Sequence, residues 1–404
     1  MNTQTPSPTR IVILGAGYAG MNAALRLAHH TRGLPVALTL VNAGDTFVER
    51  VRLHQTGQVR QRPIGNILRE TNVRFVQARV LSITPDAQTV TVQRQDEQET
   101  LAYDYLLYAL GSSADKTSIS GVREHTLAVG DPADAARLHE RLAHLPSGGQ
   151  VVVVGGGLTG IETAAEIAEA YPALRVRLVT SGVLGATLSA SGRAHLHAVF
   201  ARFGVAVQEH SPVARVEAGA LISTSGESIP FDVCAWAGSF RALPLGREAG
   251  LPVNARDQIL VDAALRSVAH ANIYVAGDSA ALTHDPGAPI RMACATALPL
   301  ASHAADNLYA RLTGGEQRPF GFGYFFQCIS LGRQDGLIQF VRPDDSPTER
   351  ILTGRAAAWV KEAVCRYAAA MAATPFGARN HRWPKQHRAA QHGDENQREA
   401  YQSS

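Results

Sequence analysis

The sequence predicts an α/β protein made of two similar βαβ units and a small C-terminal region. Two observations lead to this prediction: a glycine-rich turn joins an apolar strand to a helix twice, and each helix is followed by another apolar strand. The composition agrees with it. A chain of 404 residues that is 45% hydrophobic and 18% charged is typical of a soluble protein with two or three domains.

The first unit lies close to the N-terminus. Residues 11–14 form an apolar strand, 15–20 read Gly-Ala-Gly-Tyr-Ala-Gly, Ala and Leu recur at helical spacing over 21–29, and 36–41 is a second apolar run. In a G-x-G-x-x-G turn the glycines allow a tight strand exit, close approach of a pyrophosphate, and packing of the helix on the strand. The candidate cofactor contacts here are Gly15, Ala16, Gly17, Tyr18, Ala19 and Gly20.

The second unit repeats this order 140 residues later. A strand at 151–154 leads into Gly-Gly-Gly-Leu-Thr-Gly at 155–160, a helix at 161–169 and a strand at 176–180. A helix N-terminus offers free N–H groups and a positive dipole end to phosphates. One such turn is a weak signal, but two at the spacing of a domain predict two Rossmann-like dinucleotide-binding domains. The candidate contacts of the second turn are Gly155, Gly157, Leu158, Thr159 and Gly160.

The remaining elements follow from the same patterns. Alternating or wholly apolar runs predict further strands at 73–80, 89–93, 103–110, 231–237 and 272–276. Helical periodicity predicts helices at 292–312 and at about 355–373, with an aromatic and glycine-rich segment at 320–326 between them.

The polar residues that end the second strand of each unit bear on nucleotide choice. An acid is common there, because it binds the ribose hydroxyls. The first unit has Asn42 instead, and the second has Thr180 and Ser181. A 2′-phosphate would therefore not be repelled by the second unit, although a plain polar strand end is an equally good interpretation.

Charge and cysteine content exclude several classes of protein. A formal net charge of +3 gives no reason to expect nucleic-acid binding. The four cysteines are far apart and form no metal-ligand or dithiol motif, which favours a reducing compartment and predicts no metal site. With no signal-like N-terminus and no run of 18 apolar residues, we expect a cytoplasmic protein that does not span a membrane.

With these motifs the sequence resembles the flavoprotein reductases that have two dinucleotide-binding domains, and among them the type II NADH dehydrogenase-like group. The resemblance covers about residues 10–320. Its specific stretches, which occur in the family's order, are 11–20, 103–111, 151–166, 234–238 and 273–278. It implies that the first glycine turn binds FAD and the second NAD(P)H, with the FAD domain split around the NAD(P)H domain.

The implied domain boundaries follow from this order. They are 1–118 and 251–320 for the two parts of the FAD-binding domain, 119–250 for the NAD(P)H-binding domain, 321–376 for a C-terminal region with a helix, and 377–404 for a disordered tail.

The resemblance also implies four further site residues. Asp278 matches an aspartate on the flavin ribityl chain or pyrophosphate, although a helix N-cap would explain it equally. Arg52 and Val80 match positions that touch FAD, with a surface cation as the alternative for Arg52. Glu162 matches an acid that faces the nicotinamide and flavin; it is the candidate catalytic residue, for proton relay or positioning, unless it only stabilises the helix start.

The sequence departs from the family pattern in the helix after the Gly-Asp motif. Family members that reduce quinones carry a Gln-containing motif there, whereas this chain reads Cys-Ala-Thr-Ala-Leu-Pro at 294–299. Quinone specificity is therefore open. No cysteine lies near the first helix, so a redox disulfide is not expected, and Cys294 and Cys328 are interpreted as small buried hydrophobes. His54 is either a residue near the flavin or an ordinary buried or surface histidine.

The resemblance implies an FAD-dependent oxidoreductase that passes hydride from NAD(P)H to flavin and electrons to a quinone or other small acceptor. The alternative is a nucleotide-sensing or interaction protein without turnover. The helix at 355–373 has one apolar face and is followed by basic residues, so contact with the inner face of a membrane, with a partner subunit or with the protein's own core are the three possibilities.

Overall fold

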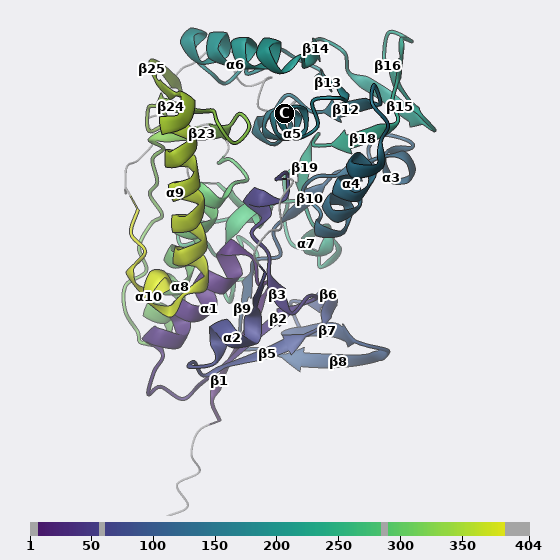
Figure 1. The fold of residues 1–404 in the computed structure, drawn as a ribbon. Coiled ribbons are helices and arrows are strands. Elements are labelled where there is room, and N and C mark those ends of the chain that lie inside the picture. Colours follow the sequence, from purple (N-terminus) through teal and green to yellow (C-terminus); the bar gives the residue numbers. More distant parts are fainter. Residues whose placement is uncertain (1–6, 56–60, 284–289, 384–404) are drawn as a thin grey trace, which may run out of the picture.

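The fold consists of two α/β domains and a C-terminal sheet and helix (Figure 1). The computed structural model describes residues 7–55, 61–283 and 290–383. Each domain contains a five-stranded parallel sheet, as the two predicted βαβ units require. The prediction of an α/β fold with two Rossmann-like domains is therefore confirmed.

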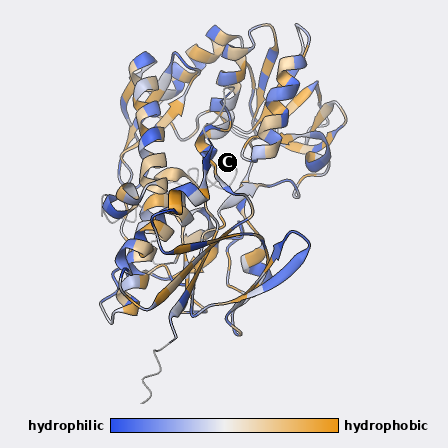
Figure 2. Ribbon diagram, turned by 60° about the horizontal axis from the view of Figure 1, so that its bottom comes forward, coloured by the Kyte–Doolittle hydropathy of each residue, from blue (hydrophilic) through white to orange (hydrophobic). Residues whose placement is uncertain are grey.

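The first sheet has the order β21-β9-β1-β2-β5. Its strands are β1 (Thr9–Leu14), β2 (Val36–Asn42), β5 (Val73–Gln77), β9 (Tyr105–Tyr108) and β21 (Ile273–Val275), and helix α1 (Tyr18–His30) connects β1 to β2. Strand β21 comes from far along the chain and still pairs with β9. The strands are apolar along most of their length because helices cover the sheet. Figure 2 shows this concentration of hydrophobic residues along the strands.

The second sheet has the equivalent order β11-β18-β12-β13-β14. Its strands are β11 (Leu127–Ala128), β12 (Gln150–Val154), β13 (Arg175–Val179), β14 (Ala206–Gln208) and β18 (Val233–Trp236), and its helices are α4 (Pro132–His144), α5 (Leu158–Ala170) and α6 (Ala190–Phe203). Asp131 caps α4, since its carboxylate accepts from the N–H groups of Ala133 and Asp134.

Smaller elements surround and join the two domains. Three-stranded antiparallel sheets are formed by β6 (Arg79–Thr84), β7 (Thr89–Arg94) and β8 (Glu97–Ala102), and by β15 (Val213–Glu217), β16 (Ala220–Ser223) and β17 (Ser228–Pro230). The antiparallel pair β10 (Ser112–Ala114) and β19 (Phe240–Ala242) lies between the domains. The short elements are β3 (Thr46–Phe47), β4 (Arg62–Pro63), β20 (Ile259–Val261), β22 (Ala280–Leu282), η1 (Arg50–Arg52), η2 (Gly277–Ser279), α2 (Ile64–Leu68), α3 (Val122–His125) and α7 (Leu245–Glu248).

The C-terminal region spans both domains. It contains an antiparallel sheet of β23 (Phe326–Ser330), β24 (Gly336–Val341) and β25 (Pro347–Thr353), and the helices α9 (Gly354–Ala373) and α10 (Pro375–Asn380). Helix α8 (Cys294–Leu312) precedes this region and packs on α1 of the first domain. Helix α9 packs on β23 and β24 at one end and on α1 at the other (Figure 1). Helix α9 therefore packs directly on α1 of the first domain, and on β23, the strand that contacts α5 of the second domain.

The structure corrects four predicted boundaries. Helices α1 and α5 begin three residues early, because Gly17 and Gly157 are their N-caps and the end of each glycine turn is already helical. The run 73–80 is two strands that change direction at Ala78, and the β23–β25 sheet was not predicted at all. Disorder from 377 is wrong for 377–383, since α10 is folded and its Gly377 and Ala378 are buried; 384–404 lie outside the described residues.

Candidate active site

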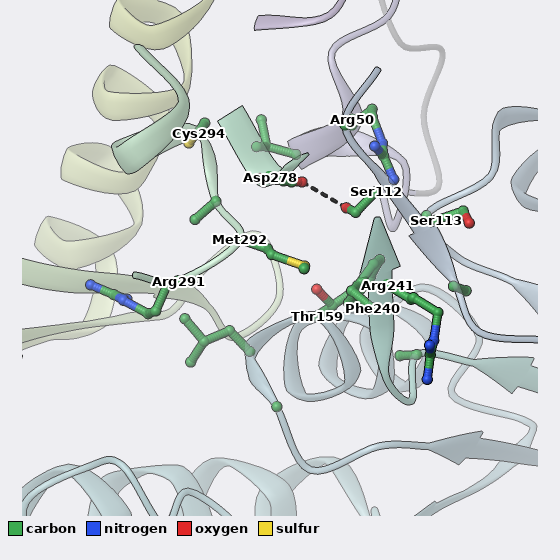
Figure 3. A pocket seen from close by; sticks show the side chains of 18 of the residues that line it. Arg50, Ser112, Ser113, Thr159, Phe240, Arg241, Asp278, Arg291, Met292 and Cys294 are labelled. Carbon is green, nitrogen blue, oxygen red and sulfur yellow. Dashed lines mark hydrogen bonds between the residues drawn. The ribbon is translucent and has the colours of Figure 1, made fainter. Parts of the chain in front are cut away.

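Both glycine turns open into one cavity of about 2300 Å³ at the carboxyl ends of the two sheets. Ligand pockets are commonly about 300–1,000 Å³, so this volume is large enough for more than one ligand of ordinary size. The residues after β1, β9, β21, β12 and β18 line it, together with parts of β23 and α9. Figure 3 shows its central part, between Asp278, Thr159, Phe240 and Met292.

The first glycine turn has the geometry that a phosphate needs. Gly15 has φ +93°, a left-handed conformation that other residues rarely adopt. Gly20 lies against the carbonyl oxygen of Gly15, so any side chain there would separate the helix from the strand. A side-chain carbon on Gly17 would meet no atom within 4 Å, so its backbone faces open space in the cavity.

The second turn repeats these relations. Gly155 has φ +122°, Gly160 lies against the carbonyl oxygen of Gly155, and Gly157 is open in the same way as Gly17. The free N–H groups at the starts of α1 and α5 thus face the same cavity from its two sides, which fits two anionic dinucleotides.

The cations that line the cavity support an anionic ligand. Arg50, Arg79, Lys116, Arg123, Arg241, Arg247, Arg256, Arg291, Lys361 and Arg382 outnumber the lining acids Asp115, Asp131, Glu162, Asp257 and Asp278. Among the residues that the structure describes, no group of His, Cys, Asp and Glu side chains is arranged to hold a metal ion.

Asp278 bridges two segments of the first domain rather than capping a helix. Its Oδ2 accepts a hydrogen bond of 2.6 Å from the hydroxyl of Ser112, as drawn in Figure 3, and Ser279 binds the backbone of Gly111. The residue before η2 is Ala276, and no side chain caps that turn. The carboxylate therefore lies at the junction of η2 and β10, on the cavity wall.

Asn42 and Val80 also lie on the wall, beside the first glycine turn. The Asn42 Oδ1 accepts from the N–H of Ala16 at 2.9 Å, and its Nδ2 donates to the carbonyl oxygen of Gly44. The Asn42 amide thus holds the glycine turn at the end of β2 without adding a charge.

Arg52 does not reach the cavity. Its guanidinium makes two hydrogen bonds, of 2.7 and 3.0 Å, to the Glu362 carboxylate on α9 and one of 3.0 Å to Glu49. Arg50, two residues earlier, is the arginine of this turn that lines the cavity, close to Gly111 (Figure 3). The turn at 50–52 is a 3-10 helix, so residues two apart point in different directions.

Glu162 is buried on α5, with 7% of its surface exposed, and lines the cavity. Its Oε1 lies 2.8 Å from the Lys361 ammonium and accepts from the N–H of Ser330 at 2.9 Å. Burial raises the pKa of Glu162, but Lys361 chiefly outweighs this and leaves the pKa below its usual range. The same ion pair overcomes burial to hold the pKa of Lys361 well above its usual value. The pair is therefore ionised at neutral pH.

His54 lies beside this pair and is 3% exposed. Its Nδ1 is 3.8 Å from Oε2 of Glu162, and burial is the main cause that lowers the pKa of His54. The His54 Nε2 and the Tyr18 hydroxyl are both buried without a hydrogen-bond partner in the described structure, and both residues line the cavity. Such groups are costly unless a bound molecule satisfies them. The site therefore fits a resident ligand with polar atoms.

The four cysteines form no disulfide. Cys294 and Cys328 line the cavity, and Cys365 is buried behind it on α9. Burial raises the pKa of Cys294 to about 12 and that of Cys365 to about 11, so these two thiols stay protonated and unreactive at neutral pH.

The structure thus places most of the predicted site residues at one cavity. Gly15, Ala16, Gly17, Tyr18, Ala19, Asn42, Val80, Gly155, Gly157, Leu158, Thr159, Glu162 and Asp278 line it, Gly20 and Gly160 lie directly behind it, and Arg52 lies outside. The sequence reasoning missed Arg50, Ser112 and Lys361. Ser112 follows the strand-ending glycine, which is a usable signal; nothing in the α9 sequence marks Lys361.

Comparison with known proteins gives a consistent result. Residues 9–306 match the family model described as pyridine nucleotide-disulphide oxidoreductase. The chain is 29% identical to a demethylphylloquinone reductase of Synechocystis, over 83% of this chain and 87% of that one. It is 31% identical to an NADH dehydrogenase-like protein of Mycobacterium tuberculosis, over 80% of this chain and 86% of that one.

Solved structures show the same fold at lower identity. NDH2 from Plasmodium falciparum, solved with NADH, superposes with a TM-score of 0.76 at 17% identity, covering 92% of this chain and 96% of that one. The sulfide:quinone oxidoreductase of Aquifex aeolicus gives 0.73 at 20% identity and 92% coverage of both chains. Among the described residues, no helix has both the length and the apolar character needed to cross a bilayer.

Proposed function

Because the chain belongs to the pyridine nucleotide-disulphide oxidoreductase family, we propose that it is an FAD-dependent NAD(P)H dehydrogenase that delivers electrons to a quinone or a similar small acceptor. The observation that carries this proposal is the convergence of two open glycine turns on one cavity. Two dinucleotides bound at those turns would meet end to end, which is the arrangement that electron transfer between them needs.

In this proposal the first domain holds FAD. Gly17 and the start of α1 would receive the pyrophosphate, Val80 and Asn42 would lie near the adenosine, and Asp278 would bind the ribityl chain or pyrophosphate. Arg50 replaces Arg52 as the proposed cationic contact. The second domain would hold NAD(P)H through Gly157, Leu158 and Thr159 at the start of α5. When bound, the flavin supplies the two-electron chemistry between the nicotinamide and the acceptor.

Glu162, Lys361 and His54 are the proposed polar groups beside the reacting atoms. An ionised carboxylate held by Lys361 and the Ser330 N–H is fixed in place, so it can orient a donor group of a bound nicotinamide. Reduction of a quinone by NAD(P)H also consumes one proton from solution. The His54 Nε2 lies free in the cavity wall next to the Glu162–Lys361 pair, and this group of three can hold and pass on that proton.

The acceptor is proposed to be a quinone on two grounds. Two kinds of relative are named quinone reductases, the Synechocystis protein and a type II NADH:quinone oxidoreductase of Staphylococcus aureus that is 24% identical over 88% of this chain. The C-terminal part of the cavity wall is also apolar and aromatic, with Phe322, Tyr324, Phe325 and Phe326. A flat apolar ring suits such a wall.

Spectroscopy and an acceptor screen test the function. The purified protein should be yellow, and anaerobic NADH or NADPH should bleach it. Steady-state oxidation should then be faster with a menadione-type quinone than with a ferredoxin or oxygen. A protein that cannot be loaded with FAD would overturn the proposal, and rapid bleaching without turnover on any acceptor would favour a nucleotide sensor.

We also propose that α9 and α10 rest on a membrane surface. Their exposed side chains include Trp359, which is 76% exposed, Phe376, which is 68% exposed, and Tyr367, with Arg355, Arg366 and Arg379 among them. Aromatic and basic side chains together favour the interface of an anionic bilayer. Vesicles rich in anionic lipid should sediment the protein, and vesicles of neutral lipid should not. If equal amounts of the protein stay in the supernatant with both kinds of vesicle, the membrane proposal is wrong, and contact of this face with a partner subunit is the alternative.

A further inference from the structure

The end of β13 carries no acid, although dinucleotide-binding domains commonly have one at the equivalent position to bind the ribose. After β13 the chain runs through Thr180, Ser181 and Gly182, and this loop pairs with the loop after β14. The N–H of Ser211 donates to the carbonyl oxygen of Thr180, and that of His210 to the carbonyl oxygen of Gly182. The two loops therefore form one fixed rim on the cavity.

The acid that precedes His210 in the sequence does not line the cavity. The Glu209 Oε1 accepts from the N–H of Leu184 at 2.7 Å, which ties its side chain to the loop after β13. Glu227 binds the side chain of Gln208 and does not line it either. The part of the cavity wall formed by 179–187 and 210–213 is thus free of carboxylates.

One basic side chain belongs to this part of the cavity wall, and a cationic one lines the cavity from the element beside β15, the strand that begins at the end of this wall. His210 is exposed on the rim, lines the cavity, and has φ +51°, a left-handed conformation that is uncommon for a residue with a side chain. Arg123 lines the cavity from α3, which packs beside β15. Neither side chain makes an ion pair within the described parts of the chain.

We propose that the nicotinamide nucleotide of this protein is NADPH, with its 2′-phosphate bound at the rim by Ser181 and His210 and neutralised in part by Arg123. This inference rests on the proposed function and names the substrate of that site. An acid at the strand end would bind the ribose hydroxyls of NADH and repel the phosphate. A hydroxyl, an imidazole and a guanidinium provide donors for a phosphate dianion.

Binding of nucleotide fragments to the FAD-loaded protein tests the rim directly. By titration calorimetry, 2′,5′-ADP should bind at least ~10-fold more tightly than 5′-AMP, the scale of one charge-assisted hydrogen bond. Anaerobic stopped-flow should show flavin reduction by NADPH at least as efficient as by NADH. Equal binding of the two fragments, or a tenfold preference for NADH, would overturn the inference.

Three variants test whether the 2′-phosphate binds at this rim. His210→Asn keeps a residue that tolerates the left-handed conformation and should weaken 2′,5′-ADP binding while 5′-AMP binding stays the same. Ser181→Glu supplies the missing acid and should shift the preference toward NADH by ~10-fold or more. The control is His197→Ala, on the exposed surface of α6, which should change neither. If His210→Asn and Ser181→Glu both leave the fragment ratio unchanged, the phosphate does not bind at this rim.

The two proposals fail in different ways. If neither nucleotide reduces the flavin, the proposed function is wrong. If NADH alone reduces it, the dehydrogenase function stands and only the NADPH inference is wrong.

Discussion

The helices α1 and α5 each follow a glycine turn of the same geometry, yet at matching positions one buries a neutral amide and the other an ionised carboxylate. Two residues after the last glycine of each turn, α1 has Asn22 and α5 has Glu162. Asn22 is neutral and fully buried; it donates to the carbonyl oxygen of Met371 and accepts from Ser302. Glu162 is an ionised acid paired with Lys361. In both cases the partner comes from α9, so one C-terminal helix completes both units.

The contrast continues one turn later, where α1 has Arg26 and α5 has Glu166. Arg26 binds Asp306 on α8 and the carbonyl oxygen of Ala378, so it fastens α1 to other helices. Glu166 binds Arg333 near β23. The backbone of the glycine turn is therefore the same in both units, while the buried residues that follow it differ in charge and in the elements that they bind.

Replacement of Lys361 by Met should have the largest effect. It leaves Glu162 buried without its counter-ion, which costs about 3–5 kcal/mol of unfolding free energy. Denaturant unfolding at neutral pH measures this. Adding Glu162→Gln to the same protein should recover most of the loss, and Arg215→Met, which breaks the exposed pair with Glu217, should change stability by less than about 1 kcal/mol. A small loss for Lys361→Met would mean that the pair is not desolvated.

Glu162→Gln should come next: it also lowers stability, because it leaves the buried Lys361 ammonium without its counter-ion, but its distinguishing effect should be on rates. If the carboxylate orients the nicotinamide or relays a proton, flavin reduction should slow by ~10- to 1000-fold while FAD stays bound. Anaerobic stopped-flow gives the rate and the charge-transfer absorbance with NAD(P)⁺. An unchanged rate together with unchanged absorbance would remove Glu162 from the site.

The matching change in the first unit, Asn22→Ala, should affect stability alone. It removes the partner of the Ser302 hydroxyl and of the Met371 carbonyl, at a cost of about 1–3 kcal/mol. Thermal unfolding of the FAD-loaded protein would show the loss, and the rate of flavin reduction should match that of the parent. A slower reduction would mean that Asn22 affects the reaction as well as the stability, so that the two helices would not differ in this respect.

The smallest expected effect is a pH dependence at Asp306. Burial alone would raise its pKa, but hydrogen bonds from His30 and Arg26 bring it from 3.8 to about 2. Because the folded pKa is depressed, this stability is present above about pH 4 and is lost as pH falls toward 2. Asp306 is partly exposed, so we expect about 1 kcal/mol after solvent screening. Asp306→Asn should flatten unfolding free energy against pH in that window; an unchanged slope would contradict the assignment.

The sequence predicts the parts of this site that depend on neighbouring residues. The glycine turns are local, since Gly15, Gly17 and Gly20 act on each other's backbone. The Glu162–Lys361 pair joins the second domain to the C-terminal region, and α9 carries no motif that would reveal it. Arg50 and Arg52 show why assigning a residue from a family's sequence position can fail. The two residues lie on one short 3-10 helix, and its geometry decides which of them faces the cavity.

The C-terminal region shows a second limit. Its charged and Gln-rich composition predicts disorder from 377, yet residues at its start are anchored by contacts that composition does not show. The Trp383 indole donates to the carbonyl oxygen of Gly321 at 3.0 Å, and Ala378 is fully buried against the first domain. A few anchoring side chains thus outweigh the average character of a segment.

Helix α9 also has a mechanical consequence. Its neighbouring residues Lys361 and Glu362 form ion pairs with different domains. Lys361 pairs with Glu162 of the second domain, and Glu362 pairs with Arg52 of the first. Rotation of one domain against the other would have to break at least one of these two contacts, so the helix braces the two domains. The helix therefore constrains the spacing between the two glycine turns without a bound ligand, so the proposed electron transfer would take place on a rigid frame and would not need domain closure.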